Sequence, residues 1–192
     1  MNTFSRVAIV MAGITGLTSL LTPALADTKP GDKPAAMPEM KPPAELAEMA
    51  KSSVGTWKCK GLGMDHTMKM ADMVGTMKFK MSLDNWWLQS SFESSTGKEP
   101  FRLESFTTFD PASKKWKRVM VESGGGWSSG ESAGLKDGKL DWELTSHSAM
   151  GESMFRDHAE TTDPKAGTKM WGEFSMDKGK TWTKVYEMTC KK

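Results

Sequence analysis

The chain has 192 residues, and its 26 Lys and Arg against 24 Asp and Glu give a formal net charge of +2. Such a balanced charge provides no electrostatic reason to expect a nucleic-acid partner, and the length suggests one folded domain. The composition is unusual in its 17 Met and 8 Trp, against a single Tyr.

The N-terminal segment has the pattern of a secretory signal peptide. Arg6 precedes an uncharged run that ends at Ala24-Leu25-Ala26, which combines a charged start, an apolar middle and a small-residue cleavage site. We therefore expect residues 1–26 to be removed and the protein to be periplasmic or secreted. No Cys follows the cleavage site, and no later apolar run is long enough to cross a bilayer. The mature chain is predicted to have neither a lipid anchor nor a transmembrane segment.

The composition then changes over residues 27–43, which carry five of the nine prolines and no apolar periodicity. We predict a disordered, Pro-rich tether. Pro43 can open a short helix over residues 44–51, in which Leu46, Met49 and Ala50 share one face. The folded domain is predicted to cover residues 44–192.

From residue 54 onward the pattern is that of short strands separated by turns. Apolar and polar residues alternate with the period of a half-buried strand, and Asp, Asn, Gly and Pro mark turns between the runs. The apolar faces include Trp57 with Cys59, Met77 with Phe79 and Met81, Leu140 with Trp142 and Leu144, and Trp182 with Tyr186, Met188 and Cys190. Typical strand and turn lengths predict about ten strands. The fold class is therefore all-β.

The two Cys residues favour closure of this meander into an antiparallel up-and-down β-barrel. Cys59 lies in the first predicted strand and Cys190 in the last. A disulfide requires Cα atoms within about 7 Å, which the two ends of a flat sheet would not allow but a closed barrel would. An oxidising compartment makes the bond expected. The alternative is a pair of unrelated buried thiols.

The first strand carries a motif that resembles a known family. Residues 55–61 read Gly-Thr-Trp-Lys-Cys-Lys-Gly, and a short helix before Gly-x-Trp is similar to the entry of calycin-type barrels, the lipocalin and fatty-acid-binding superfamily. More closely, the chain resembles the bacterial family called domain of unknown function 1579. The Glu187-Met188-Thr189-Cys190 run and the Phe109-Asp110 and Lys115-Trp116 segments also match its pattern, and the two departures from that pattern are Cys59 and Cys190. The resemblance implies a small secreted calycin-like barrel with no established activity.

The alternation also predicts which side chains line a ligand cavity. We expect Arg118 and Asp157 to point inward, where they could pair and orient a ligand head group. A buried ion pair without a ligand, or a one-residue slip of register, would explain the same pattern. The predicted lining consists of Trp57, Met77, Phe79, Arg118, Trp142, Leu144, Asp157 and Tyr186. The first hypothesis is therefore a non-enzymatic binding protein for a small apolar or amphipathic molecule.

A second hypothesis comes from a Met-rich segment after the first strand. Thioethers and imidazoles are suitable ligands for Cu(I), so a cluster of them in a periplasmic loop could bind copper. The candidate donors are Met64, His66, Met68, Met70 and Met73. Met also fills irregular apolar spaces, which is the structural alternative. A third hypothesis is an envelope protein whose barrel is filled by its own side chains.

Two further patterns do not favour chemistry. Residues 126–130 and 130–134 both satisfy the Gly-x-Ser-x-Gly pattern of esterases, but no predicted helix follows Ser128 or Ser132. His147, predicted in a turn, and His158, on a polar face, could be compared with axial haem ligands but are expected to be solvated. We expect no enzymatic activity and no cofactor, copper being the alternative.

Overall fold

A computed structural model describes residues 40–161, 163 and 165–192, so the predicted signal peptide and most of the predicted tether lie outside the described residues. The described chain contains one helix and ten strands. Their bounds are α1 Ala44–Ser53, β1 Gly55–Met64, β2 Met70–Ser82, β3 Trp87–Thr96, β4 Glu99–Asp110, β5 Lys115–Glu122, β6 Trp127–Ser132, β7 Lys139–Ser148, β8 Gly151–Glu160, β9 Thr168–Ser175 and β10 Thr183–Lys191. The predicted helix begins where expected and continues two residues further.

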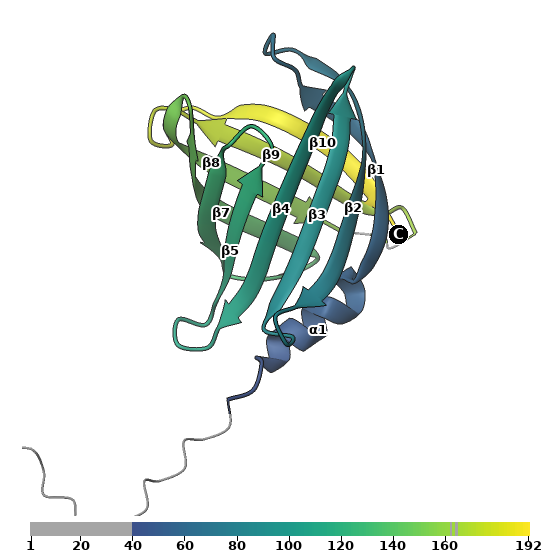
Figure 1. Cartoon of the computed structure of the whole chain (residues 1–192), viewed down its shortest axis with the longest axis vertical. Coiled ribbons are helices and arrows are strands. Elements are labelled where there is room, and N and C mark those ends of the chain that lie inside the picture. Colours follow the sequence, from purple (N-terminus) through teal and green to yellow (C-terminus); the bar gives the residue numbers. More distant parts are fainter. Residues whose placement is uncertain (1–39, 162, 164) are drawn as a thin grey trace, which may run out of the picture. The chain divides into compact units, whose positions relative to one another are not determined.

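The strands form one closed barrel in which each pairs antiparallel with its neighbours in sequence, and β1 pairs with β10 (Figure 1). The predicted all-β, up-and-down barrel is therefore confirmed. Closure removes the two sheet edges that an open meander would leave unpaired. Within the described residues, no helix has the length and apolar character needed to cross a membrane.

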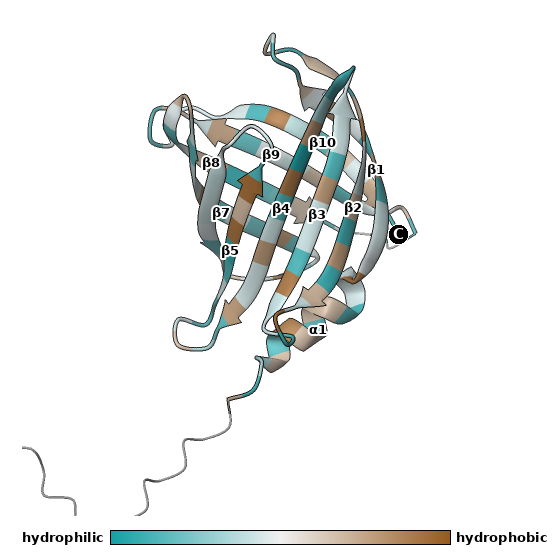
Figure 2. Cartoon of the chain, viewed as in Figure 1, coloured by the Kyte–Doolittle hydropathy of each residue, from teal (hydrophilic) through white to brown (hydrophobic). Residues whose placement is uncertain are grey.

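Alternation along the strands separates the two faces of the sheet. On β1, Lys58 and Lys60 are exposed, whereas Cys59 between them is 2 % exposed. Bands of apolar and polar residues follow one another along the strands in the same way (Figure 2). Because side chains alternate across a pleated sheet, the buried residues define the inner face of the barrel.

Two glycines mark sharp bends in the barrel wall. A Cβ atom on Gly61 would lie 2.0 Å from the carbonyl oxygen of Glu187, and one on Gly130 would lie 2.0 Å from that of Glu143. The neighbouring strand can approach so closely only because no side chain is present. The bends lie between β1 and β10 and between β6 and β7. They divide the wall into a six-stranded side, β1 to β6, and a four-stranded side, β7 to β10.

Helix α1 lies against the ends of β2, β3 and β4 and covers one end of the barrel (Figure 1). Leu46 has no exposed surface and packs with Leu88, Trp116 and Trp142. The indole Nε1 of Trp57 donates a hydrogen bond to the carbonyl oxygen of Ser53, 2.8 Å away, at the end of the helix. A helix this short has little stability in isolation, so burial of its apolar face holds it in place.

Cys59 and Cys190 are register partners on β1 and β10, and their Sγ atoms lie 2.06 Å apart, as a disulfide requires. The bond joins the first and last strands beside the Gly61 bend. The predicted contact between these two cysteines is therefore present in the closed barrel.

One face assignment from the sequence is wrong. Trp182 was expected to share the face of Tyr186, but its ring lies under the Arg156 guanidinium, with 3.9 Å from Cζ to the ring centroid. Arg156 is on the outer face of β8. The β9–β10 register shifts between Lys184 and Tyr186, and such a bulge exchanges the faces before and after it.

Candidate functional site

The barrel interior contains two apolar clusters. One lies next to α1 and includes Leu46, Trp142 and Leu144. The other surrounds the disulfide and includes Met77 and Met188. Phe79 packs against both clusters, so the apolar lining of the interior is continuous from one cluster to the other.

Large apolar side chains on the inner face are incompletely buried toward the end of the barrel opposite α1. Phe101, Leu103, Met120, Phe155 and Phe174 occupy inward positions there and are all partly exposed. Near the helix, Phe79, Met81 and Phe109 are partly exposed as well, whereas Leu46 of α1 and Trp142 have 0 % and 1 % exposed surface. Because the wall is closed, exposure on the inner face means that water-sized groups reach the interior. Helix α1 covers one end of the barrel, and the inner face keeps some solvent-accessible surface.

A polar cluster bridges the interior. Arg118 on β5 donates from Nη1 to Oδ2 of Asp157 on β8, 2.5 Å away. The hydroxyl of Tyr186 on β10 donates to Oδ1 of the same carboxylate. The Arg118 guanidinium also lies over the ring of Trp142, with 3.8 Å between Cζ and the ring centroid. We refer to Arg118, Trp142, Asp157 and Tyr186 as the polar cluster.

Register explains how the polar cluster forms. Trp142, Asp157, Gly172 and Tyr186 are successive register partners across β7, β8, β9 and β10. A Cβ atom on Gly172 would lie 2.3 Å from the Tyr186 ring. The missing side chain on β9 therefore lets the phenol reach across that strand to Asp157. Arg118 approaches from the six-stranded side, so the ion pair spans the two sides of the barrel.

The polar cluster is largely, but not completely, removed from solvent. The side chains of Arg118 and Asp157 are 16 % and 10 % exposed. Burial raises the pKa of Tyr186 well above its usual value, and the negative charge and hydrogen bond of Asp157 raise it further, against a smaller opposing effect of Arg118. The phenol therefore remains a hydrogen-bond donor at physiological pH.

Two buried donors in the polar cluster, Arg118 Nε and Trp142 Nε1, have no hydrogen-bond partner within the described part of the chain. Leaving a buried donor unpaired costs about 1–3 kcal/mol. Both unpaired donors lie at the contact where the Arg118 guanidinium stacks on the Trp142 indole. Unpaired polar groups of this kind are uncommon in protein interiors and call for a functional explanation.

The predicted lining residues all occupy inward positions, but not all belong to one contact group. Trp57 and Met77 lie with the disulfide cluster, Leu144 lies near the helix, and Phe79 lies between them. Arg118, Asp157, Trp142 and Tyr186 make the direct contacts described above.

Sequence reasoning missed the buried hydroxyl pair of Ser90 and Ser105 on β3 and β4, whose Oγ atoms are 2.7 Å apart. Each Ser lies at an inward position of its strand, which was the available signal.

The structure does not bring the five candidate copper donors to one face. Met64 and Met70 are register partners on the outer face, whereas Met73 is buried on the inner face with the disulfide cluster. Met68 is 59 % exposed in the β1–β2 turn. The Nδ1 atom of His66 contacts Oε1 of Glu99. Met70 and Met73 are three residues apart in one strand, which places them on opposite faces.

The remaining candidate residues lie on β-strands. Ser128 and Ser132 are buried on β6, and no helix follows them in the part of the chain that the structure describes. His158 stacks on Trp171, and its Nδ1 lies 2.6 Å from Oδ1 of Asp141. His147 lies within β7 rather than in the expected turn and stacks on Trp127. Its strand extends further than the Ser-rich sequence indicated, because β7 and β8 stay paired up to Ser148 and Gly151.

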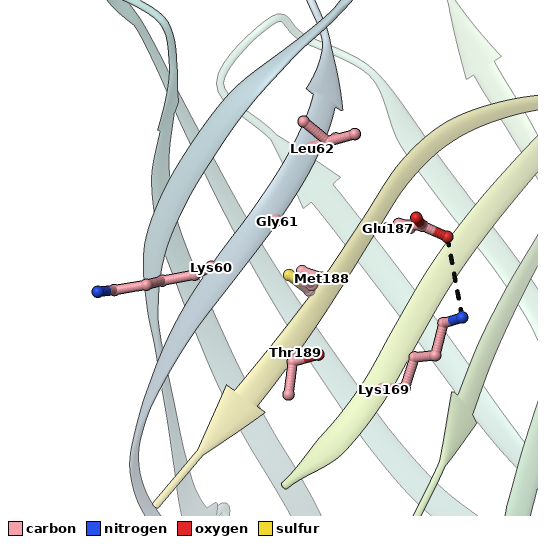
Figure 3. A pocket seen from close by; sticks show the side chains of 7 residues that line it. All are labelled: Lys60, Gly61, Leu62, Lys169, Glu187, Met188 and Thr189. Carbon is pink, nitrogen blue, oxygen red and sulfur yellow. Dashed lines mark ion pairs between the residues drawn. The ribbon is translucent and has the colours of Figure 1, made fainter. Parts of the chain in front are cut away.

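A separate depression of about 340 Å³ lies over the bend between β1 and β10 (Figure 3). Its lining includes Lys60, Leu62, Met188, Glu187 and Lys169. Lys169 Nζ and Glu187 Oε2 form an ion pair at 4.0 Å across it. The depression is open to solvent, and its one carboxylate, Glu187, is already paired with Lys169, so the interior polar cluster is the stronger candidate site.

Comparisons with known proteins support the fold. No family model matches the sequence, and no curated protein matches it either. Among solved structures, the chain is similar to Rv2717c from M. tuberculosis, with a TM-score of 0.58 and 9 % sequence identity. The match covers 78 % of this chain and 98 % of Rv2717c. At this level of identity, the similarity establishes a shared barrel fold.

Proposed function

We propose that this protein is a non-enzymatic binding protein that holds a small apolar or amphipathic molecule inside the barrel. The supporting observation is the polar cluster, which lies in the barrel interior beside two apolar clusters and whose ion pair keeps some exposed surface. Ligand sites in β-barrels combine these two elements, an apolar wall and a few placed polar groups. A barrel filled only for stability would gain more from apolar side chains at Arg118 and Asp157, because burying an ion pair is costly.

The proposed location is the periplasm or the extracellular space. The N-terminal pattern over residues 1–26 and the Cys59–Cys190 disulfide both support this location. In that setting, a closed barrel would protect an apolar molecule from water. The proposed role requires no covalent chemistry.

Binding of Nile red, an uncharged apolar dye, tests the proposal. We expect saturable binding of one dye molecule per barrel with an increase in fluorescence. Leu103→Trp adds bulk at a partly exposed inward position and should weaken dye binding at least about tenfold, or about 1.4 kcal/mol. Native mass spectrometry of protein purified from its own cells should in addition detect a bound small molecule.

A matched substitution on the outer face provides the control. Val119 on the neighbouring strand β5 is 43 % exposed and points outward, so Val119→Trp should leave dye binding unchanged. Circular dichroism would verify that both variants are folded. Absence of saturable dye binding to the native protein, or equal effects of the two substitutions, would contradict the proposal.

A further inference from the structure

The polar cluster of the proposed ligand site contains a buried cation, Arg118, whose charge determines which head groups the interior accepts. Some apolar-ligand binders use a buried Arg to hold a carboxylate, which requires that the Arg lack another anionic partner. Here Asp157 already occupies that position, with 2.5 Å between Nη1 and Oδ2. The pair is electrically neutral, and Tyr186 donates a further hydrogen bond to the same carboxylate.

The remaining charges on the inner face do not change this result. Alternation places four charged residues of the described strands at inward positions: Arg118 and Asp157 in mid-strand, and Glu99 and Glu122 at the end opposite α1. The Glu99 carboxylate contacts His66 in the β1–β2 turn, and the Glu122 carboxylate lies beside Gly126 in the β5–β6 turn, so Arg118 and Asp157 are the two charges in mid-strand. An anionic ligand in the interior would therefore meet a cation that is already neutralised. Placing a second carboxylate there would leave one negative charge without a partner, which is costly in a low-dielectric interior.

The hydrogen-bonding groups of the polar cluster also favour one kind of ligand. Its two unpaired buried groups, Arg118 Nε and Trp142 Nε1, are both donors. A complementary ligand group would therefore accept hydrogen bonds without carrying charge, as the carbonyl oxygen of an ester, ketone or amide does. The side chains of Arg118 and Asp157 keep 16 % and 10 % of their surface exposed, so the ion pair is not sealed from solvent.

We infer that the barrel selects uncharged, carbonyl-bearing apolar molecules and discriminates against carboxylates, and that Asp157 is the residue that sets this preference by neutralising Arg118. This inference rests on the proposed binding function. Asp157 acts through electrostatics: removing its charge while keeping its size should expose the positive charge of Arg118 to the ligand.

Three ligands with the same twelve-carbon chain test the inference: methyl dodecanoate, dodecanoate and dodecyltrimethylammonium, each measured below its aggregation concentration by displacement of Nile red at neutral pH. We expect the ester to bind at least about tenfold more tightly than either charged ligand. Asp157→Asn should raise the affinity for dodecanoate relative to the ester by about tenfold. Asp141→Asn, which removes a carboxylate from the outer face, should leave the order unchanged.

The outcomes separate the inference from the proposed function. If Nile red and all three ligands fail to bind the native protein, the binding function itself is wrong. If they bind but dodecanoate or the ammonium ligand is favoured or equal to the ester, the inference is wrong and the binding function stands. If Asp157→Asn is folded by circular dichroism and the affinity for dodecanoate relative to the ester is unchanged, the role assigned to Asp157 is also overturned.

Discussion

Tyr186 reports directly on the polar cluster, because it is the single tyrosine of the chain. Its phenol is buried, and its hydroxyl donates to a carboxylate, so ionisation would place two negative charges side by side without solvent. The physical consequence is a pKa raised above the usual value of 10.0. Because its pKa is higher in the folded chain than in the unfolded chain, Tyr186 stabilises the folded state fully below pH 10, the unfolded-state value. This stabilisation is lost as the pH rises from there through the folded-state pKa.

Ultraviolet absorbance of tyrosinate measures this prediction without interference from other tyrosines. We expect Tyr186 in the native protein to ionise at a higher pH than in the chain unfolded in denaturant, which should titrate near the ordinary pKa of about 10. Asp157→Asn removes one cause of the shift and should lower the native pKa, but burial should keep it above that of the unfolded chain. Identical native and unfolded titration curves would show that Tyr186 is not in the described environment.

At the scale of the strands, the two bend glycines have a structural role that can be tested. Gly130→Ala would place a Cβ atom 2.0 Å from the Glu143 carbonyl oxygen and 2.6 Å from the Leu144 Cα atom. Both contacts involve backbone, so the strands must separate. We expect a loss of about 1–3 kcal/mol or more in the free energy of unfolding, measured by urea denaturation.

Gly124→Ala is the matched control for this prediction. The nearest atom to a Cβ atom at Gly124 is Glu122 Oε1, at 3.4 Å, and this glycine lies in the exposed β5–β6 turn. Both substitutions remove the same unfolded-state freedom of glycine, so the difference between them isolates the steric effect. Equal unfolding midpoints would mean that the wall at Gly130 is not bent as described.

The strand scale also shows which features the sequence could predict. Alternation assigned the inner faces of β1, β2, β5, β7 and β8 correctly. Within one regular strand, every second residue points to the same face, so the sequence spacing alone decides the face. Alternation allowed a pairing of Arg118 with Asp157 but could not decide between this contact and a slip of register, since the contact depends on the bends and register of strands that are not neighbours. The face of Trp182 was predicted wrongly because the bulge between Lys184 and Tyr186 leaves no recognisable pattern in so short a segment. The opposite faces of Met70 and Met73, by contrast, could have been inferred from their spacing.

At the scale of the whole molecule, closure of the barrel depends on the pairing of its first and last strands. The Cys59–Cys190 bond connects them across a sequence separation of 131 residues. In the unfolded chain, the same bond forms a loop that contains nearly the entire barrel and so restricts the unfolded ensemble. The loop-entropy relation gives about 5 kcal/mol of stabilisation for a loop of this length.

Replacing both cysteines, Cys59→Ala with Cys190→Ala, should therefore lower the free energy of unfolding by about 5 kcal/mol through loss of the crosslink, and further through loss of packing. Urea denaturation of the native protein, of the reduced native protein and of the double variant separates two contributions. The difference in the free energy of unfolding between native and reduced protein gives the contribution of the crosslink. The difference between reduced protein and double variant gives the contribution of packing by the two cysteine side chains, each 2 % exposed. Because β1 and β10 keep their backbone pairing in all three forms, the reduced protein should still unfold cooperatively from a closed barrel. If reduction left the unfolding midpoint unchanged, pairing of β1 with β10 would be sufficient for stability and the disulfide would contribute nothing to closure.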